Sequence, residues 1–158
     1  MRIREIKIED NFQLETIIKT IFIDLELPLT GTVYDDIDTT RMFESYQEDK
    51  AVYFVVEVNG VVKGGAGIKA LKNQEGAVCE LQKMYLSSDT RRKGYGKLLI
   101  ERCLDAAKAM GYKQCYLETL SELKVAQNLY KNYGFDYLEN AMGNTGHTSC
   151  GVKMLKPL

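Results

Sequence analysis

The beginning of the chain combines a short strand pattern with an amphipathic helix pattern. From Arg2 to Ile8, apolar and polar side chains alternate, which is typical of a half-buried strand. Asp10 and Gln13 then stand at the spacing of a capping box. The apolar residues after them recur every three or four positions: Leu14, Ile17, Ile18, Ile21, Phe22 and Leu25. This pattern predicts a first helix, which the segment Pro28–Thr32 interrupts.

The middle of the chain is predicted to form a short helix and then three strands. The helix is expected near Asp38–Gln47, in an acidic segment. Three stretches rich in strand-forming residues follow at Ala51–Val58, Val61–Ala70 and Ala77–Leu86. The dipeptide Asn59-Gly60 separates the first two, and Asn-Gly between strands is a strong signal for a tight hairpin. We therefore expect antiparallel pairing here.

The second half of the chain alternates helices and strands. Apolar residues at helical spacing predict a helix from Gly96 to Met110, which ends at Gly111, and another that begins at an N-cap Ser121 and ends at Gly134. Strands are expected at residues 112–119, 135–138 and 149–155. The whole pattern predicts an α+β fold with a mixed, mostly antiparallel central sheet of about seven strands and about four flanking helices. One domain is expected over residues 1–158.

Composition and charge exclude several classes of protein. An apolar content of 45% is enough for a buried core in 158 residues. A net charge of −1 and a pI of about 5.9 provide no overall basic surface for nucleic acid or an anionic membrane. The N-terminal segment lacks the apolar core of a signal peptide, and no apolar run approaches the ~20 residues that span a bilayer. We expect a cytoplasmic protein without nucleic-acid or membrane partners; its oligomeric state stays open, a homodimer included.

The four cysteines do not suggest a disulfide framework. Cys79, Cys103, Cys115 and Cys150 stand far apart in apolar surroundings and form no C-x-x-C pair. We expect buried free thiols and no metal site.

A basic turn precedes the helix predicted to start near Gly96. Arg91–Lys93 lie before that helix, and Lys97 lies one turn inside it. Cations at a helix N-terminus oppose the macrodipole and cost roughly a few tenths of a kcal/mol each. A phosphate or pyrophosphate would compensate them, because the first-turn N–H groups are free and Gly94 and Gly96 let an anion approach the backbone.

This turn does not fit the two most common phosphate-binding motifs. A Rossmann fingerprint would need glycine at Leu99, and a P-loop would need serine or threonine at Leu98. A solvated basic loop without a bound anion is the simplest alternative.

Two segments resemble the motifs of the GNAT (GCN5-related N-acetyltransferase) family. Arg91-x-x-Gly94-x-Gly96 matches the family's Q/R-x-x-G-x-G/A signature, and Ala126–Phe135 is similar to its A-x-x-L-Y-x-x-x-G-F motif. The segment Glu80–Leu86 resembles the family's fourth strand. The motifs stand in the family's order, separated by one helix and one strand, and the predicted element order agrees over nearly the whole chain. The resemblance implies a GNAT fold and an acyltransferase that uses acetyl-CoA as co-substrate.

The resemblance also implies where acetyl-CoA binds. Backbone groups of Met84 and Leu86 are expected to contact the pantetheine arm, one of them stabilising the oxyanion. Asn128 and Tyr133 of the second motif are expected to contact the cofactor. The expected pyrophosphate site comprises Arg91, Arg92, Lys93, Gly94, Tyr95, Gly96 and Lys97.

Acetyl transfer to an amine needs a base for the amine proton and an acid for the leaving thiolate. Glu80 matches the general base of some family members, and strand alternation would place it on one face with Gln82, Met84 and Leu86. A Glu80 paired to a neighbouring cation is the structural alternative. Glu118 on the next strand is the rival base.

Tyr130 matches the family's tyrosine that protonates the thiolate. Without the motif, a tyrosine on an apolar helix stripe would be interpreted as core. The roles of His147 and Cys150 stay open between structure, lining of the acceptor pocket and catalysis, and the loop Gly143–Gly146 could shape that pocket.

Together these features predict an N-acetyltransferase that moves an acetyl group from acetyl-CoA to a primary amine of a small molecule or peptide, by direct attack in a ternary complex. Acidic residues between Asp35 and Asp49 suggest a cationic acceptor such as a polyamine, although a solvated surface accounts for them equally well. The alternative functions are a non-catalytic acyl-CoA-binding or regulatory module of the same fold, and a nucleotide-binding protein that uses the same basic turn.

Overall fold

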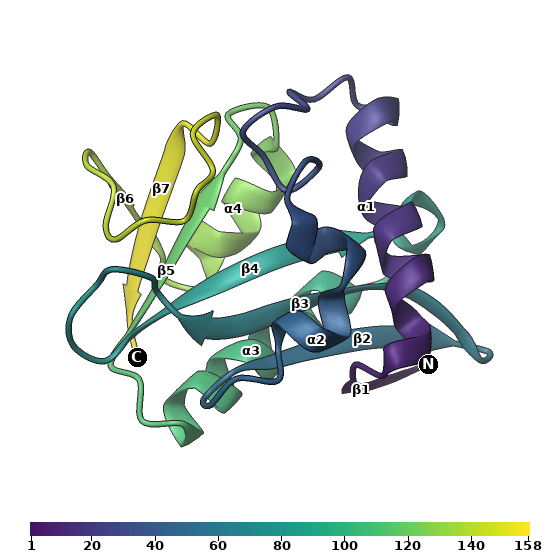
Figure 1. Ribbon diagram of the computed structural model, residues 1–158, viewed down its shortest axis with the longest axis horizontal. Coiled ribbons are helices and arrows are strands. Elements are labelled where there is room, and N and C mark those ends of the chain that lie inside the picture. Colours follow the sequence, from purple (N-terminus) through teal and green to yellow (C-terminus); the bar gives the residue numbers. More distant parts are fainter.

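The computed structural model describes residues 1–158 and contains one seven-stranded sheet (Figure 1). The strands lie in the order β1-β2-β3-β4-β5-β7-β6, and every neighbouring pair is antiparallel except β4 and β5. Their bounds are β1 Arg2–Glu5, β2 Val52–Val58, β3 Val61–Ala70, β4 Val78–Leu86, β5 Gln114–Thr119, β6 Asp136–Leu138 and β7 Val152–Pro157. The predicted mixed, mostly antiparallel sheet is confirmed.

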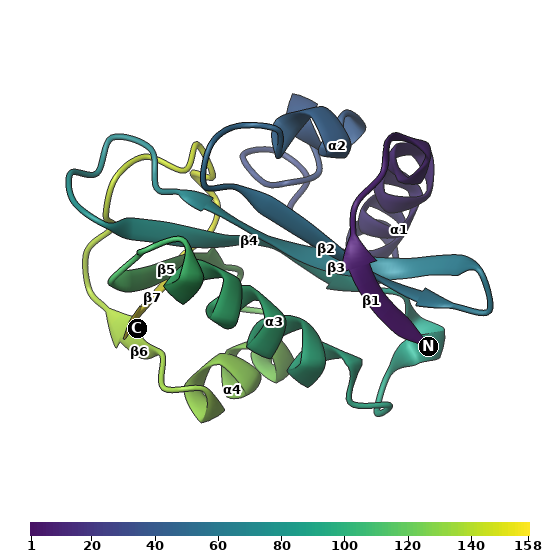
Figure 2. The same cartoon turned by 90° about the horizontal axis from the view of Figure 1, so that it is seen from below.

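Helices cover both faces of the sheet. The four α-helices are α1 Asn11–Asp24, α2 Met42–Ser45, α3 Tyr95–Ala109 and α4 Lys124–Asn132, with 3-10 turns η1 Ile8–Asp10, η2 Ile37–Thr40 and η3 Ser88–Thr90. Figure 2 shows α1 and α2 on one side of the sheet and α3 and α4 on the other. None of these helices is long and apolar enough to cross a bilayer.

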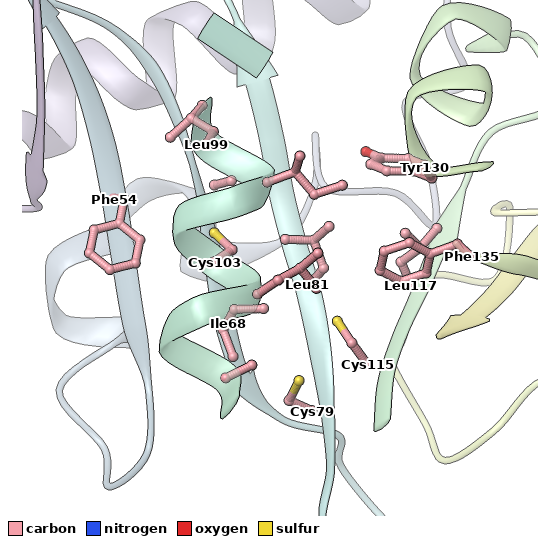
Figure 3. Packing of buried hydrophobic residues seen from close by; sticks show 14 of the residues in the cluster. Phe54, Ile68, Cys79, Leu81, Leu99, Cys103, Cys115, Leu117, Tyr130 and Phe135 are labelled. Carbon is pink, nitrogen blue, oxygen red and sulfur yellow. The ribbon is translucent and has the colours of Figure 1, made fainter. Parts of the chain in front are cut away.

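The largest core lies between the sheet and α3 and α4. It contains 18 buried residues, some of which Figure 3 shows from close by. Smaller clusters lie on the α1 and α2 side. All four cysteines are buried and free, as predicted: Cys79, Cys103, Cys115 and Cys150.

Turn chemistry in the sequence predicts several boundaries correctly. Asn59 and Gly60 have φ angles of 51° and 80° and join β2 to β3. Gly111 and Gly134 follow α3 and α4 with φ angles of 88° and 85°. These left-handed positions end the helices because glycine adopts them without steric cost.

Strands β4 and β5 separate after a short parallel pairing. They are paired from Val78 and Gln114 to Glu80 and Tyr116, and no further. Beyond Tyr116, strand β5 continues to pair with β7 on its other side. The edge of β4 after Glu80 therefore has no strand beside it, and the sheet is open at this point.

The same strand β4 contains a bulge. Two of its residues, Lys83 and Met84, stand opposite the single Ala66 of β3. Lys83 has a φ of 48°, in the left-handed region. The hydroxyl of Tyr53, whose side chain is buried, donates a hydrogen bond of 2.8 Å to the displaced carbonyl of Lys83.

The bulge corrects the predicted alternation of side chains along β4. Met84 and Leu86 pack against the core on the α3 and α4 side, whereas Glu80 and Gln82 line a cavity on the opposite face. The prediction that these four residues share one face is wrong, because the extra residue at Lys83 reverses the alternation.

The N-terminal boundaries also differ from the prediction. Strand β1 ends at Glu5, and Asp10 precedes α1 without capping it through its side chain. The buried Asp10 carboxylate instead accepts from the N–H of Lys7 and pairs with both terminal nitrogens of Arg4, at 2.7 and 2.9 Å. A bidentate ion pair with an arginine stabilises this carboxylate more than a single hydrogen bond to a helix N-terminus would.

Two further helix predictions are wrong in detail. The helix expected near 38–47 is split into η2 and α2 by Arg41, whose φ of −137° is not helical. The side chain of Asn11 accepts from the N–H of Phe43 at 2.7 Å, so a distant residue supports the start of α2. Helix α4 is preceded by Leu123 rather than by Ser121 as N-cap.

The hydrogen bond to the bulge generates a stability prediction. We expect Tyr53→Phe to lower the free energy of unfolding by about 1–3 kcal/mol, because the buried Lys83 carbonyl would lose its donor. Urea denaturation measures the change. Tyr112→Phe is the matched control, since its hydroxyl donates to Lys50 in a partly buried position and should cost less. A Tyr53→Phe protein as stable as the wild type would contradict this role.

Candidate active site

The N-terminus of α3 can bind an anion. Gly94 precedes the helix with a left-handed φ of 77°, and no side chain caps this end. The N–H of Arg91 donates to Ser88 and that of Leu98 donates to Gly94, while no backbone N–H between them donates within the chain. These free donors point out of the positive end of the helix dipole, which favours a phosphate group.

Basic side chains surround the same helix end. The predicted cations Arg91, Arg92, Lys93 and Lys97 are all exposed. None of them belongs to an ion pair in the structure. A bound anion would therefore be the counter-charge of this cluster.

A hollow of about 720 Å³ between α3 and α4 adjoins this helix end. Three residues predicted to contact a cofactor line it: Lys97, Asn128 and Tyr133. Val125, Leu129 and Asn132 complete the lining and were not predicted. A hydrogen bond to Glu101 raises the pKa of Tyr133 to about 12.

Tyr130 extends from α4 into the main core. Its ring packs against Phe135 with centroids 6.0 Å apart, and only 6% of the residue is exposed. Its hydroxyl has no hydrogen-bond partner within the chain, yet every fully buried side-chain oxygen or nitrogen in the structure has one. The hydroxyl must therefore reach an accessible space, and Figure 3 shows it directed away from α4 toward β4.

The opposite face of the sheet carries a polar cavity of about 270 Å³. Thirteen residues line it, and none is hydrophobic. They come from the segment after α1, from β3 and the turn after it, from β4, and from the loop before β7. The cavity and the α3 site therefore lie on opposite faces, on either side of the opening between β4 and β5.

Glu80 is the buried carboxylate of this cavity. It is 3% exposed, and burial raises its pKa above the ordinary value, against a hydrogen bond from Gln82 and the charges of His147 and Lys83, which lower it. Tyr46 donates from its hydroxyl to the Gln82 amide oxygen at 2.9 Å, and the Gln82 amide nitrogen donates to Glu80 Oε2. The other oxygen of Glu80 has no partner and remains available to accept a proton.

Asp36, Lys83 and His147 form a second group in the cavity. Asp36 Oδ2 lies 2.5 Å from Lys83 Nζ and 3.5 Å from His147 Nε2. Burial opposes ionisation of Asp36, but hydrogen bonds and charge from His147 and Lys83 hold its pKa well below the usual range. This acidic residue is therefore already neutralised by its neighbours.

Glu118 anchors the loop that closes the cavity. Its two oxygens accept hydrogen bonds of 2.6 Å from Tyr116 and 2.7 Å from Thr145. The N–H of His147 donates in turn to the Thr145 hydroxyl at 3.2 Å. Both oxygens of the rival base are thus engaged in holding this loop.

Cys150 lies behind this loop in a small hydrophobic cluster. Burial raises the pKa of its thiol to about 12, so it stays protonated near neutral pH. Of the two residues whose roles were open, His147 lines the cavity, and Cys150 does not.

Six cavity residues were not predicted as site residues: Gly31, Thr32, Lys69, Lys72, Gln82 and Lys83. Alternation along β4 did place Gln82 on the face of Glu80, and pairing of β3 with β4 could have added Lys69, which stands opposite Glu80. No sequence signal could have placed Lys83 there, because its direction depends on the bulge.

Comparison with known proteins identifies one family. The sequence model of the acetyltransferase (GNAT) family matches residues 19–135. The chain is also 37% identical over 156 residues to an uncharacterized N-acetyltransferase of Escherichia coli strain K12, YjgM. That alignment covers 98% of this chain and 93% of the bacterial protein.

Solved structures share the same fold. An acetyltransferase of the GNAT family from Staphylococcus aureus superposes with a TM-score of 0.86 at 17% identity, over 99% of this chain and 98% of that chain. The Salmonella typhimurium protein yncA, solved with its cofactor acetyl-CoA, superposes with a TM-score of 0.78 at 22% identity, over 100% and 94% of the two chains. The predicted fold is confirmed.

The buried carboxylate predicts an unusual dependence of stability on pH. Because burial raises the pKa of Glu80, the folded state loses stability as pH rises through that pKa. We expect Glu80→Gln to be more stable than the wild type near pH 7, with the difference disappearing below the ordinary pKa of about 4.3. Thermal unfolding between pH 3.5 and 8 measures it. A variant that is less stable than the wild type at pH 7 would contradict the prediction.

Proposed function

The chain belongs to the acetyltransferase (GNAT) family, and from this we propose that it transfers an acetyl group from acetyl-CoA to a primary amine of a small molecule or peptide. One observation carries the proposal. An anion-binding helix end and a cavity with a buried carboxylate lie on opposite faces of the sheet, and both adjoin the opening between β4 and β5. Two substrates could therefore enter from opposite sides and meet at this opening.

The first site fits the pyrophosphate of acetyl-CoA. The free N–H groups after Arg91, the left-handed Gly94 and the unpaired basic side chains supply donors and positive charge at one helix end. The hollow lined by Asn128 and Tyr133 continues from there between α3 and α4. These residues would hold the nucleotide part of the co-substrate.

The unpaired edge of β4 fits the pantetheine arm. This arm contains amide groups, which can pair with a free strand edge as another strand would. Met84 and Leu86 are the backbone groups that we propose for these contacts, with one N–H stabilising the oxyanion. The divergence after Glu80 supports this arrangement, because β5 leaves the edge accessible.

Glu80 is the proposed general base. When bound, acetyl-CoA supplies a thioester whose carbonyl carbon the neutral amine attacks; the C–N bond forms, the C–S bond breaks and the amine proton passes to Glu80. A carboxylate with a raised pKa is suited to accept that proton near neutral pH. Its unpaired oxygen favours Glu80 over Glu118, both of whose oxygens are occupied.

Tyr130 is the proposed acid. Burial raises the pKa of its hydroxyl above the usual value, so the hydroxyl keeps its proton near neutral pH. It can then donate that proton to the departing sulfur. Its unpartnered hydroxyl supports this role, because a tyrosine serving only as core would normally satisfy its polar group.

A simple assay separates this proposal from its alternatives. We expect thiol release from acetyl-CoA that depends on an added primary amine. Tight CoA binding without thiol release for any amine would instead indicate a non-catalytic acyl-CoA-binding module. Thermal stabilisation by ATP but not by CoA would indicate a nucleotide-binding protein.

Gly94→Asp tests the cofactor site. We expect a loss of acetyl-CoA affinity of at least about 10²-fold, because the carboxylate would occupy the anion site and repel phosphate. Gly111→Asp is the matched control: Gly111 has a similar φ of 88°, and both glycines have open space beside them, so the backbone strain should be comparable. Calorimetric titration with CoA measures both. Equal affinity in the two variants would contradict the proposed site.

Tyr130→Phe tests the acid. We expect kcat to fall by about 10²-fold with little change in acetyl-CoA affinity, because only the proton donor is removed. Tyr137→Phe serves as control, since its ring is half exposed at the sheet edge. If kcat of Tyr130→Phe matched the wild type across the pH range, the acid role would have to be abandoned.

A further inference from the structure

The polar cavity restricts the kind of amine that could be acetylated. We propose that the acceptor is a small zwitterion, a primary amine that carries a carboxylate close by, of which a free amino acid is the simplest example. This inference rests on the proposed function and specifies its substrate class.

The size and lining of the cavity support a small, polar acceptor. Its volume of about 270 Å³ lies below the range of about 300–1,000 Å³ that is usual for drug-sized ligands. No hydrophobic side chain lines it. An aromatic or long aliphatic amine would therefore leave its apolar surface against charged groups, which is unfavourable.

The acidic residues of the cavity are less available for a polycation than the sequence suggests. Asp36 is paired with Lys83 and His147. Asp35 accepts hydrogen bonds from the N–H groups of Gly31 and Thr32. Only Glu80 and Asp38 retain free carboxylate oxygens among the acidic lining residues. Two free carboxylates can bind one ammonium group, but they are too few for the several ammonium groups of a polyamine.

Two lysines of the cavity have ammonium N–H groups that no side chain or carbonyl of the protein accepts. Lys72 is exposed at the cavity and has no ion pair or side-chain hydrogen bond. The buried Lys83 donates to Asp36 alone, although an ammonium has three N–H donors. By contrast, Lys69 is occupied by Ser45 and Glu48. Lys72 and Lys83 can therefore bind a carboxylate.

The backbone around Lys72 is held in place. The N–H of Asn144 donates to the Lys72 carbonyl at 2.8 Å, which ties the end of β3 to the loop before β7. The lysine side chain thus starts from a fixed position at the cavity.

The combination matches the two charges of an amino acid. A carboxylate bound by Lys72 and Lys83 would direct the neighbouring amine to Glu80, which takes its proton before attack. The acetyl group then moves from sulfur to this nitrogen, and Tyr130 returns a proton to the sulfur, so that the products are an N-acetyl amino acid and free CoA.

Matched pairs of acceptors test the inference. The nineteen common amino acids that have a primary amine would be compared with their primary amides, which have nearly the same size but no carboxylate at the α-carbon, and with spermidine as polycation. We expect at least one amino acid to be acetylated with a kcat/KM at least about tenfold above that of its amide, as a charge-assisted contact would give. The amine of the amide loses its proton more readily than the amine of the free amino acid, so a larger share of it is neutral and able to attack. Without a site for the carboxylate, the amide would therefore be the better acceptor.

The lysine variants test the site. Lys72→Gln should reduce the ratio of kcat/KM for the amino acid to kcat/KM for its amide about tenfold. Only the value for the amino acid should fall, and the Tm of the protein should not change. The double variant Lys83→Met, Asp36→Asn removes a buried pair together and should also reduce the ratio. Lys108→Gln, an exposed lysine on α3, is the control and should leave the ratio unchanged.

Three outcomes would overturn the inference. Amides or spermidine turned over as fast as the amino acids would exclude the zwitterion but leave the proposed function intact. A ratio unchanged in both lysine variants would exclude this site for the carboxylate. No turnover of any acceptor, despite CoA binding, would overturn the proposed function as well.

Discussion

The bulge in β4 at Lys83 determines how the two halves of the candidate site are divided. Without the extra residue, Glu80 and Gln82 would share a face with Met84 and Leu86. With it, the first pair lines the polar cavity, and the second packs toward α3 and α4. One strand therefore serves both faces. The left-handed conformation of Lys83 has a cost, and the buried hydroxyl of Tyr53 helps to offset it by binding the displaced carbonyl.

The small residues of β3 make this arrangement sterically feasible. A Cβ on Gly67 would lie 2.5 Å from the ring of Tyr46, and one on Gly65 would lie 2.5 Å from that of Tyr53. Glycine at these positions lets both tyrosine rings lie against the sheet. Tyr46 then reaches Gln82, which holds Glu80, while Tyr53 reaches the bulge. Packing on one face thus orients polar groups on the neighbouring strand.

The cavity concentrates opposite charges in a small space. Buried charges are costly unless they are paired, and Asp36 with Lys83 meets that requirement. Glu80 does not, since its closest partner is the neutral amide of Gln82. A buried carboxylate without a direct cation lowers stability in a way that is typical of functional sites.

Much of the fold could be predicted from the sequence. Period-two and helical patterns predicted the strands and the long helices, and Asn59-Gly60, Gly111 and Gly134 marked turns correctly, because glycine and asparagine carry their own conformational preference. Helix ends that depend on distant side chains were missed. The start of α2 is supported by Asn11, and Asp10 pairs with Arg4 instead of capping α1.

The sequence by itself determined the order of the elements and the left-handed turn at Gly94 before α3, because both depend on neighbours along the chain. Only the tertiary structure decided the composition of the cavity. Asp36, Lys83 and His147 come from three distant segments, and Lys83 faces Asp36 only because β4 bulges. A strand's alternation predicts direction only while its register holds, and a bulge arises from packing against Tyr53 and β3, which no local pattern contains.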